Sequence, residues 1–147
     1  MKNGLRPRIN ENWSCMSKAD PLSDYFVFSD DREFNYPGTL LCVFDETFAT
    51  PDDFWPVVAK GLHFPGYFGN NWDALNDCLS TGHWYLETNI CIIHERFPFA
   101  FDEYNILYLS ILADAVRRTS VLCFPYSIRA IFRTADKGYI QNLADTR

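Results

Sequence analysis

The sequence predicts an α/β protein in which a three-stranded parallel sheet packs against helices. Three apolar runs, at residues 39–45, 89–94 and 120–124, have the composition of buried strands. Segments with helical periodicity separate these runs, and strands that alternate with helices imply parallel pairing through right-handed crossovers. Residues 127–134 alternate weakly between apolar and polar side chains. An extra edge strand is therefore expected near the C-terminus.

Residues 1–38 are expected to form a partly ordered extension, and we place the domain at residues 39–147, with its core at 39–124. The extension begins with a polar stretch that has no periodicity, and Met16 is a candidate for the start of the natural chain. Residues 25–36 are expected to form a hairpin, because two stretches rich in aromatic residues flank a Ser-Asp-Asp turn.

Capping signals and apolar spacing predict two helices outside the segment described below. The first covers residues 51–61, where Thr50 is a candidate N-cap, Pro51 suits the first helical position and two acidic residues follow. The second covers residues 100–118. Apolar side chains recur at helical spacing in both helices, and the positions expected to be buried are Phe54, Val57, Val58, Ile106, Leu109, Leu112 and Val116.

The composition excludes a disordered chain and a membrane-spanning one. Of the 147 residues, 48% are hydrophobic and 17% are aromatic, which is enough for one globular core. No apolar run approaches the roughly 18 residues of a membrane span, and the N-terminal segment lacks the apolar core of a signal peptide. A cytoplasmic location is expected.

The cysteines and histidines show neither metal-ligand spacing nor a nucleophile motif, so no cofactor and no metal are expected. Four of the five cysteines lie in apolar runs, which predicts reduced, buried thiols rather than a disulfide framework. His94, at the end of a predicted strand, is expected to be a hydrogen-bonded structural residue, with a pH-sensitive surface group as the alternative. The cysteines are Cys15, Cys42, Cys78, Cys91 and Cys123.

Acidic residues are concentrated in the middle of the chain. The formal net charge is −6, and residues 45–114 carry eleven acidic and two basic residues, whereas residues 115–147 carry two acidic and six basic ones. Direct binding of nucleic acid needs clustered Lys and Arg, which the middle region lacks. A basic protein partner suits this region better, because complementary fields accelerate association. An acidic protein without such a partner is the alternative.

The most informative segment is residues 64–79. A Pro-Gly turn is followed by Asn70 and Asn71, either of which is a candidate N-cap for a short amphipathic helix. Helical spacing divides the side chains of this helix between two faces. Those expected to face the core are Trp72, Leu75, Cys78 and Leu79, and those expected to face solvent are Asp73, Asn76, Asp77 and Ser80.

Asp73 and Asp77 form the acidic pair whose spacing asks for a functional explanation. Like charges at i and i+4 repel by about 0.2–0.5 kcal/mol. Asp73 recovers part of this cost near the positive end of the helix dipole, whereas Asp77 lies a turn deeper and recovers less. Such a pair suits binding of a divalent ion, acid–base catalysis or contact with a partner, and it also fits an ordinary solvated helix face.

This segment resembles the barstar family, which consists of small acidic inhibitors of secreted ribonucleases of the barnase type. The resemblance rests on Tyr67-Phe68-Gly69, Asn71, Asp73-Ala74-Leu75 and Asp77-Cys78-Leu79, which occur at the family's spacing without gaps. It implies a barstar-like fold with a three-stranded parallel sheet against helices. It also implies that Asp77 enters the active site of a ribonuclease where a substrate phosphate would lie. Further contacts with the enzyme are implied for Tyr67, Asn71 and, on the long helix, Asp114.

Three positions depart from the family's pattern. Trp72 replaces a leucine and is expected either to anchor a partner or to pack under the loop. Asn76 stands where the type inhibitor has a tryptophan, and Arg118 reverses the charge of a family acid. A basic residue there would repel the rim of a highly basic ribonuclease, so a partner other than barnase itself is expected.

The sequence therefore predicts a non-enzymatic intracellular inhibitor of a ribonuclease, of the immunity or antitoxin type, which blocks the active site by phosphate mimicry. The expected partner is a basic ribonuclease or toxin nuclease domain, without direct contact to nucleic acid or membrane. Two alternatives stay open: a metal-binding protein or metal-dependent hydrolase that uses the same helix carboxylates, and a barstar-like scaffold for a protein that is not a nuclease. The residues expected to contact the partner are Tyr67, Asn71, Trp72, Asp73, Asn76, Asp77 and Asp114.

Overall fold

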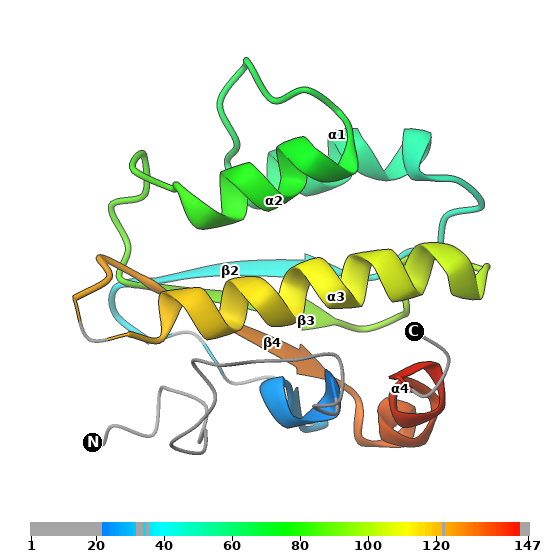
Figure 1. Ribbon diagram of the computed structural model, residues 1–147. Coiled ribbons are helices and arrows are strands. Elements are labelled where there is room, and N and C mark those ends of the chain that lie inside the picture. The colour runs from blue at the N-terminus through cyan, green and yellow to red at the C-terminus, as the bar shows by residue number, and fades with distance from the viewer. Residues whose placement is uncertain (1–21, 32–33, 35, 122, 145–147) are drawn as a thin grey trace.

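The computed structural model describes residues 22–31, 34, 36–121 and 123–144. Within this part of the chain, helices α1, α2 and α3 lie on one face of a parallel sheet (Figure 1). The predicted α/β class with parallel strands is therefore confirmed. The three helices are α1 (Pro51–Gly61), α2 (Trp72–Ser80) and α3 (Asp102–Thr119), and the strands are β1 (Val27–Phe28), β2 (Thr39–Phe44), β3 (Asn89–His94) and β4 (Ser127–Phe132).

The sheet has four strands in the order β1-β4-β3-β2, and the prediction of three strands is wrong. The described residues of the apolar run, 120, 121, 123 and 124, form no strand. Ser120 is the C-cap of α3, and the Phe124 N–H donates to the Val121 carbonyl at 3.1 Å in a turn. Residues 127–134, expected to add an edge strand, contain β4, which lies between β1 and β3. The strand predicted at the edge is thus an interior one.

The N-terminal side of the sheet is completed by β1 rather than by a hairpin. Val27 lies opposite Ile131 and Phe28 opposite Phe132 in a parallel ladder, so this strand pairs with β4 near the other end of the chain. The hairpin predicted for residues 25–36 is therefore wrong for its first arm, and residues 32, 33 and 35 of its second arm lie outside the described residues. A short 3-10 helix, η3 (Leu22–Tyr25), precedes β1 and contributes to the main core.

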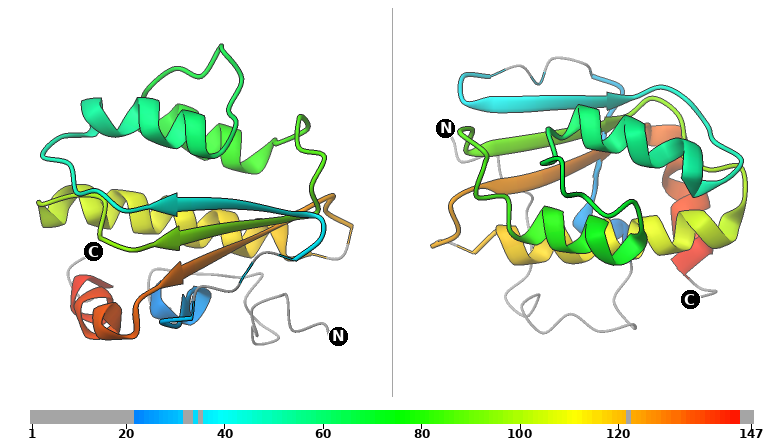
Figure 2. Two further views of the ribbon diagram at one scale, coloured as in Figure 1. Left: turned by 180° about the vertical axis from the view of Figure 1, so that it is seen from behind. Right: turned by 90° about the horizontal axis from the view of Figure 1, so that it is seen from above.

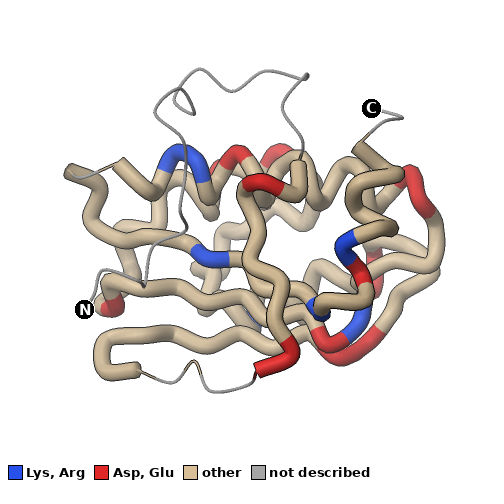
Figure 3. The backbone as a smooth tube through the Cα atoms, turned by 90° about the horizontal axis from the view of Figure 1, so that it is seen from below, with Lys and Arg blue, Asp and Glu red and all other residues tan. Residues whose placement is uncertain are grey.

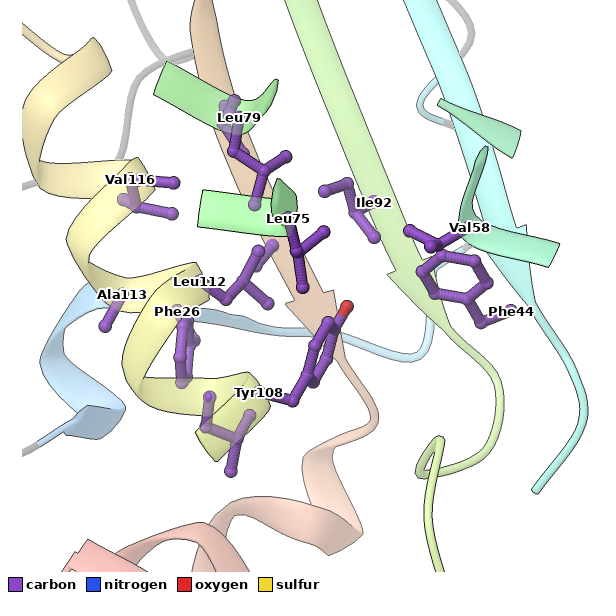
Figure 4. Close-up of a cluster of buried hydrophobic side chains, with 14 of the residues drawn as sticks. Phe26, Phe44, Val58, Leu75, Leu79, Ile92, Tyr108, Leu112, Ala113 and Val116 are labelled. Carbon is purple, nitrogen blue, oxygen red and sulfur yellow. The ribbon is translucent and has the colours of Figure 1, made fainter. Parts of the chain in front are cut away.

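The main core lies between the sheet and the three helices. In the left view of Figure 2, α1 and α2 lie above the strands and α3 runs behind them. Figure 4 shows Leu75 of α2 and Leu112 and Tyr108 of α3 close to one another beside the sheet. Burial confirms most of the predicted helix positions, with Val57 and Ile106 only partly buried. The strand side chains that face this core are Leu40, Cys42, Phe44, Ile90, Ile92, Ile128, Ala130 and Phe132.

The opposite face of the sheet carries a second, smaller apolar cluster. It contains Phe34, Cys91, Ile93 and Ile131, with Val27 and Leu41 packed against it. The Arg129 guanidinium lies on this side, 5.9 Å from the centre of the Phe34 ring. The alternation along β4 therefore reflects two differently composed faces of an interior strand.

A C-terminal helix, α4 (Lys137–Ala144), packs with η3 against α3 and was not predicted. The Tyr139 hydroxyl joins it to the start of α3, because it donates to Asp102 Oδ1 at 2.5 Å and accepts from Asn105 Nδ2 at 3.1 Å. A further link runs from the Thr134 hydroxyl to Asp30 Oδ2 at 2.7 Å. The two ends of the described chain are thus fastened to the same side of the domain.

His94 is a structural residue, as the sequence favoured. Its ring is buried, donates from Nδ1 to the Ile131 carbonyl at 2.9 Å and accepts at Nε2 from the Tyr108 hydroxyl at 2.6 Å. Burial lowers the pKa of His94 to about 4, although the bond to Ile131 opposes that shift. None of the helices in the described ranges is long and apolar enough to cross a membrane.

Candidate functional site

The loop between α1 and α2 is held in one shape by local hydrogen bonds. The Phe64 N–H donates to the Ala59 carbonyl at 2.9 Å, which closes the end of α1 and requires a left-handed residue at His63, with φ of 55°. The Phe68 N–H then donates to the Pro65 carbonyl at 3.0 Å in a turn. Asn70, with φ of 56°, turns the chain into α2.

Aromatic packing fixes the inner side of this loop. The Phe68 ring lies 4.9 Å from that of Phe64 and 6.1 Å from that of Trp55. Tyr67, by contrast, is 70% exposed beside the inward-pointing Phe68. A large aromatic side chain is therefore presented to solvent on a backbone that its neighbours hold in place.

Asn71 is the N-cap of α2, so the capping prediction is confirmed at the second of the two candidate positions. Its Oδ1 accepts from the Ala74 N–H at 2.7 Å, and its Nδ2 donates to the Gly69 carbonyl at 3.2 Å. One amide side chain thus ties the loop to the first turn of the helix. Loss of such a cap typically costs about 1 kcal/mol.

The faces predicted for α2 are confirmed at five positions, whereas Trp72, expected in the core, is only partly buried. Leu75, Cys78 and Leu79 are buried, whereas Asp73 and Asp77 are both exposed. Asn76 and Ser80 are partly buried along the flank of the helix. Residues at i and i+4 lie above one another on a helix, so the two exposed carboxylates form a short acidic row.

The Trp72 ring packs against other aromatic rings of the protein, whereas a residue that anchors a partner would be largely exposed. Its ring lies 4.9 Å from that of Trp55 and 5.7 Å from that of Phe99, both edge to face, and the side chain is partly buried. Of the two roles expected for this residue, packing under the loop is the one that these contacts describe.

Two tyrosines fasten the far end of α2, and the sequence did not indicate either. The Tyr126 hydroxyl donates to the Leu79 carbonyl at 2.7 Å and accepts from the Gly82 N–H at 2.8 Å. The Tyr85 hydroxyl donates to the Leu62 carbonyl at 2.8 Å, at the end of α1. Burial raises the pKa of both phenols, so both are held as protonated donors. These partners lie 23 to 47 residues apart, beyond any local sequence signal.

Asp114 lies in α3, and its carboxylate is paired with two arginines. Its Oδ1 is 2.7 Å from Arg117 Nη2, and its Oδ2 is 2.5 Å from Arg118 Nη2. Arg118 also donates from Nη1 to Ser80 Oγ at 2.6 Å, which links the last turns of α3 and α2. The row of Asp73 and Asp77 and the cluster around Asp114 therefore belong to one surface, which we call the α2–α3 surface.

Three of the thiols are buried and are poor nucleophiles. Cys42, Cys78 and Cys91 are buried as expected, whereas Cys123 is exposed, which corrects the prediction for that position; Cys15 lies outside the described residues. Burial raises the pKa of Cys42 to about 12 and that of Cys91 to about 11. Burial, followed by the negative charge of Asp77, raises the pKa of Cys78.

Two hollows of the structure lie away from the acidic row of α2. Both are shallow and lie at the carboxyl ends of the strands, where they are lined by Asp45 and Arg96, and neither includes Asp73 or Asp77. Among the described residues, no three side chains of the His, Cys, Asp or Glu type are grouped as metal ligands.

A family model described as Barstar (barnase inhibitor) matches residues 40–127. This range runs from the start of β2 to the first residue of β4 and includes the whole loop and α2. The search of curated proteins and the search of solved structures returned no match.

Proposed function

The chain belongs to the barstar family, and from this membership we propose that it inhibits a ribonuclease by covering the enzyme's active site with the α2–α3 surface. The observation that carries the proposal is the exposed row of Asp73 and Asp77 on a helix whose start is capped by Asn71. Within the described ranges, neither side chain makes a hydrogen bond or ion pair, and both are exposed. Their charge is available to the cationic groups that bind the phosphate of an RNA substrate.

Asp77 is proposed as the phosphate mimic. A carboxylate surrounded by several cations and removed from water makes charge-assisted hydrogen bonds, which are shorter and stronger than neutral ones. Asp73 lies one turn nearer the N-terminus on the same face and adds a second negative charge. Tyr67 supplies the exposed aromatic contact, and the partly buried Asn76 of α2 and Asp114 of α3 add polar contacts.

The rigidity of the loop and of α2 supports an inhibitory role. Binding is weakened by the ordering of flexible groups, and each immobilised long side chain costs about 0.5–1.5 kcal/mol. Here the loop is fixed by Asn71 at one end and by the contact of Tyr85 with Leu62 at the other. The surface is therefore shaped before it meets a partner.

The test is a titration against the cognate ribonuclease, identified by affinity capture from the native host and mass spectrometry. Asp77→Ala should weaken inhibition by at least about 2 kcal/mol, the level of an interface hot spot. Ser80→Ala, one turn further along α2, is the matched control and should have a much smaller effect. If Asp77→Ala inhibits as well as the wild type does, the inhibitory surface is not here.

Calorimetry separates this proposal from a metal-dependent one. We expect no micromolar binding of Mg²⁺, Mn²⁺ or Zn²⁺ and no nuclease activity of the isolated protein, because only two carboxylates come together on α2. Tight binding of a divalent ion that disappears in Asp73→Asn would favour a metal site and would contradict the proposed inhibitor.

A further inference from the structure

The α2–α3 surface carries charges of both signs, and the two signs lie at different ends of it. Asp73 lies in the first turn of α2 and Asp77 one turn later, whereas Arg117 and Arg118 lie in the last turn of α3. The bond from Arg118 to Ser80 places these arginines beside the end of α2. Figure 3 marks the charged positions along the described backbone, where acidic positions predominate and basic ones are few.

The acid on α3 does not extend the negative row of α2. Both carboxylate oxygens of Asp114 are paired, one with Arg117 and the other with Arg118. Asp114 therefore adds no unpaired negative charge to the row, and the partly exposed guanidinium of Arg118 lies beside the end of α2. A partner that docks across both helices therefore meets the carboxylates of Asp73 and Asp77 over α2 and the guanidinium of Arg118 over the end of α3.

Arg118 is held in place and still accessible. Its contacts with Ser80 Oγ and Asp114 Oδ2 fix the guanidinium between the two helices, while its side chain is 39% exposed. An acidic residue four positions before an arginine is the favoured orientation of such a pair on a helix. The remaining N–H donors of a fixed, planar guanidinium suit a carboxylate on another protein.

We propose that Arg118 sets the partner specificity of this surface. It selects a ribonuclease that presents an acidic group beside the cationic pocket that receives Asp77, and it excludes a ribonuclease whose rim is basic throughout. This inference rests on the proposed function and adds to it the charge pattern of the partner. Like charges that face each other across an interface are a strong element of discrimination.

Stopped-flow association with catalytically inactive barnase, the basic ribonuclease named in the family's description, tests the exclusion. The series is wild type, Arg118→Gln and Arg118→Glu, each measured at about 50 mM and about 500 mM salt. We expect the association rate constant at low salt to rise stepwise, with Arg118→Glu faster than the wild type by about tenfold or more. The gain should shrink at high salt.

Lys137→Glu is the matched control, because it changes the net charge by the same amount at another place. Lys137 opens α4, which packs near the start of α3, while Arg118 lies in the last turn of α3, roughly 24 Å further along that helix. The control should alter the rate constant by less than about twofold. Thermal melts of all variants establish that they fold.

Equal rate constants across the Arg118 series would overturn the proposal, and so would an equal gain in Lys137→Glu or a complete lack of association in every variant. Arg118→Gln keeps the test decisive should Arg118→Glu fail to fold. The experiments can contradict this inference and the proposed function independently of each other. Asp77→Ala measures the function with the cognate enzyme, whereas the Arg118 series measures exclusion with barnase.

Discussion

The Tyr85 hydroxyl donates a hydrogen bond to the Leu62 carbonyl at 2.8 Å, and so joins the segment that follows α2 to the end of α1. Leu62 is where the loop that carries Tyr67 begins. The two stretches of chain that flank the α2–α3 surface are thereby tied to each other. This contact gives the first of four predictions.

Tyr85→Phe should destabilise the fold by about 1 kcal/mol, because the Leu62 carbonyl loses its donor while the ring stays in place. Urea unfolding measures the change. Tyr67→Phe removes the hydroxyl from an exposed side chain and is the control, expected to change stability by less than about 0.5 kcal/mol. Hydrogen exchange in residues 62–71 should accelerate in Tyr85→Phe alone. An equal effect of both variants would show that the Leu62 contact does not hold the loop.

Gly82→Ala should be destabilising by about 1–3 kcal/mol, the usual cost of overpacking. A Cβ at Gly82 would lie 2.4 Å from the Tyr85 ring and 2.9 Å from the Tyr126 hydroxyl, and both side chains are fixed by their own hydrogen bonds. Gly138→Ala in α4 has no atom within 4 Å and should be neutral or slightly stabilising. The melting temperature should therefore fall in Gly82→Ala and stay equal or rise slightly in Gly138→Ala, and a tolerated Gly82→Ala would contradict this account.

Acid should weaken the fold through His94. Its pKa is about 4 in the folded protein, against about 6.5 when unfolded, so the unfolded chain binds the proton more readily between these values. Stability from this group is fully present above pH 6.5 and falls as the pH drops toward 4, by roughly 3 kcal/mol in total. Unfolding free energies across this range should show a steeper slope in the wild type than in His94→Gln. Parallel slopes would mean that His94 is not kept neutral by burial.

Asp77→Ala should leave the free protein as stable as the wild type or slightly more so. The substitution removes a repulsion of about 0.2–0.5 kcal/mol with Asp73, and Asp77 lies too deep in α2 to gain much from the dipole. Asp73→Ala removes the same repulsion but also the favourable position in the first turn, so it should be the less stable of the two variants. A clear loss of melting temperature in Asp77→Ala would identify Asp77 as a structural residue.

Local signals predicted the parts of the fold that depend on neighbouring residues. Thr50 and Pro51 located the start of α1, and the apolar run at residues 89–94 coincides with β3. Residue type limited the cap of α2 to Asn70 or Asn71, and helical spacing predicted its buried Leu75, Cys78 and Leu79. In these segments, one turn or one strand contains enough information to define its own boundaries.

The third strand was predicted at the wrong residues because the most apolar run in this part of the chain is not the segment that forms the strand. Residues 120–124 are apolar, yet Phe124 packs its ring 5.0 Å from that of Tyr126 in a turn. β4 contains Arg129 and resembled a half-exposed edge strand, but the guanidinium lies against Phe34 on the second face of the sheet. The contact of Arg129 with Phe34 exists only in the tertiary structure, so the sequence pattern of β4 could not indicate it.

The contacts that complete the candidate site join distant residues. Arg118 and Ser80 are 38 positions apart, and Tyr126 and Leu79 are 47 positions apart. No helical or strand period relates such positions. The sequence could therefore predict the acidic row on α2, but not the pairing of Asp114 with its two arginines.

The position of β1 in the sheet has a consequence for how the chain is made. β1 pairs only with β4 among the described strands, although the two are separated by about 100 residues and by every other strand and three helices. During synthesis the N-terminal residues leave the ribosome first, but the strand that receives them is the last to emerge. The first strand to be synthesised, β1, therefore cannot pair until the last one, β4, has been translated. The four-stranded sheet is complete only after that point.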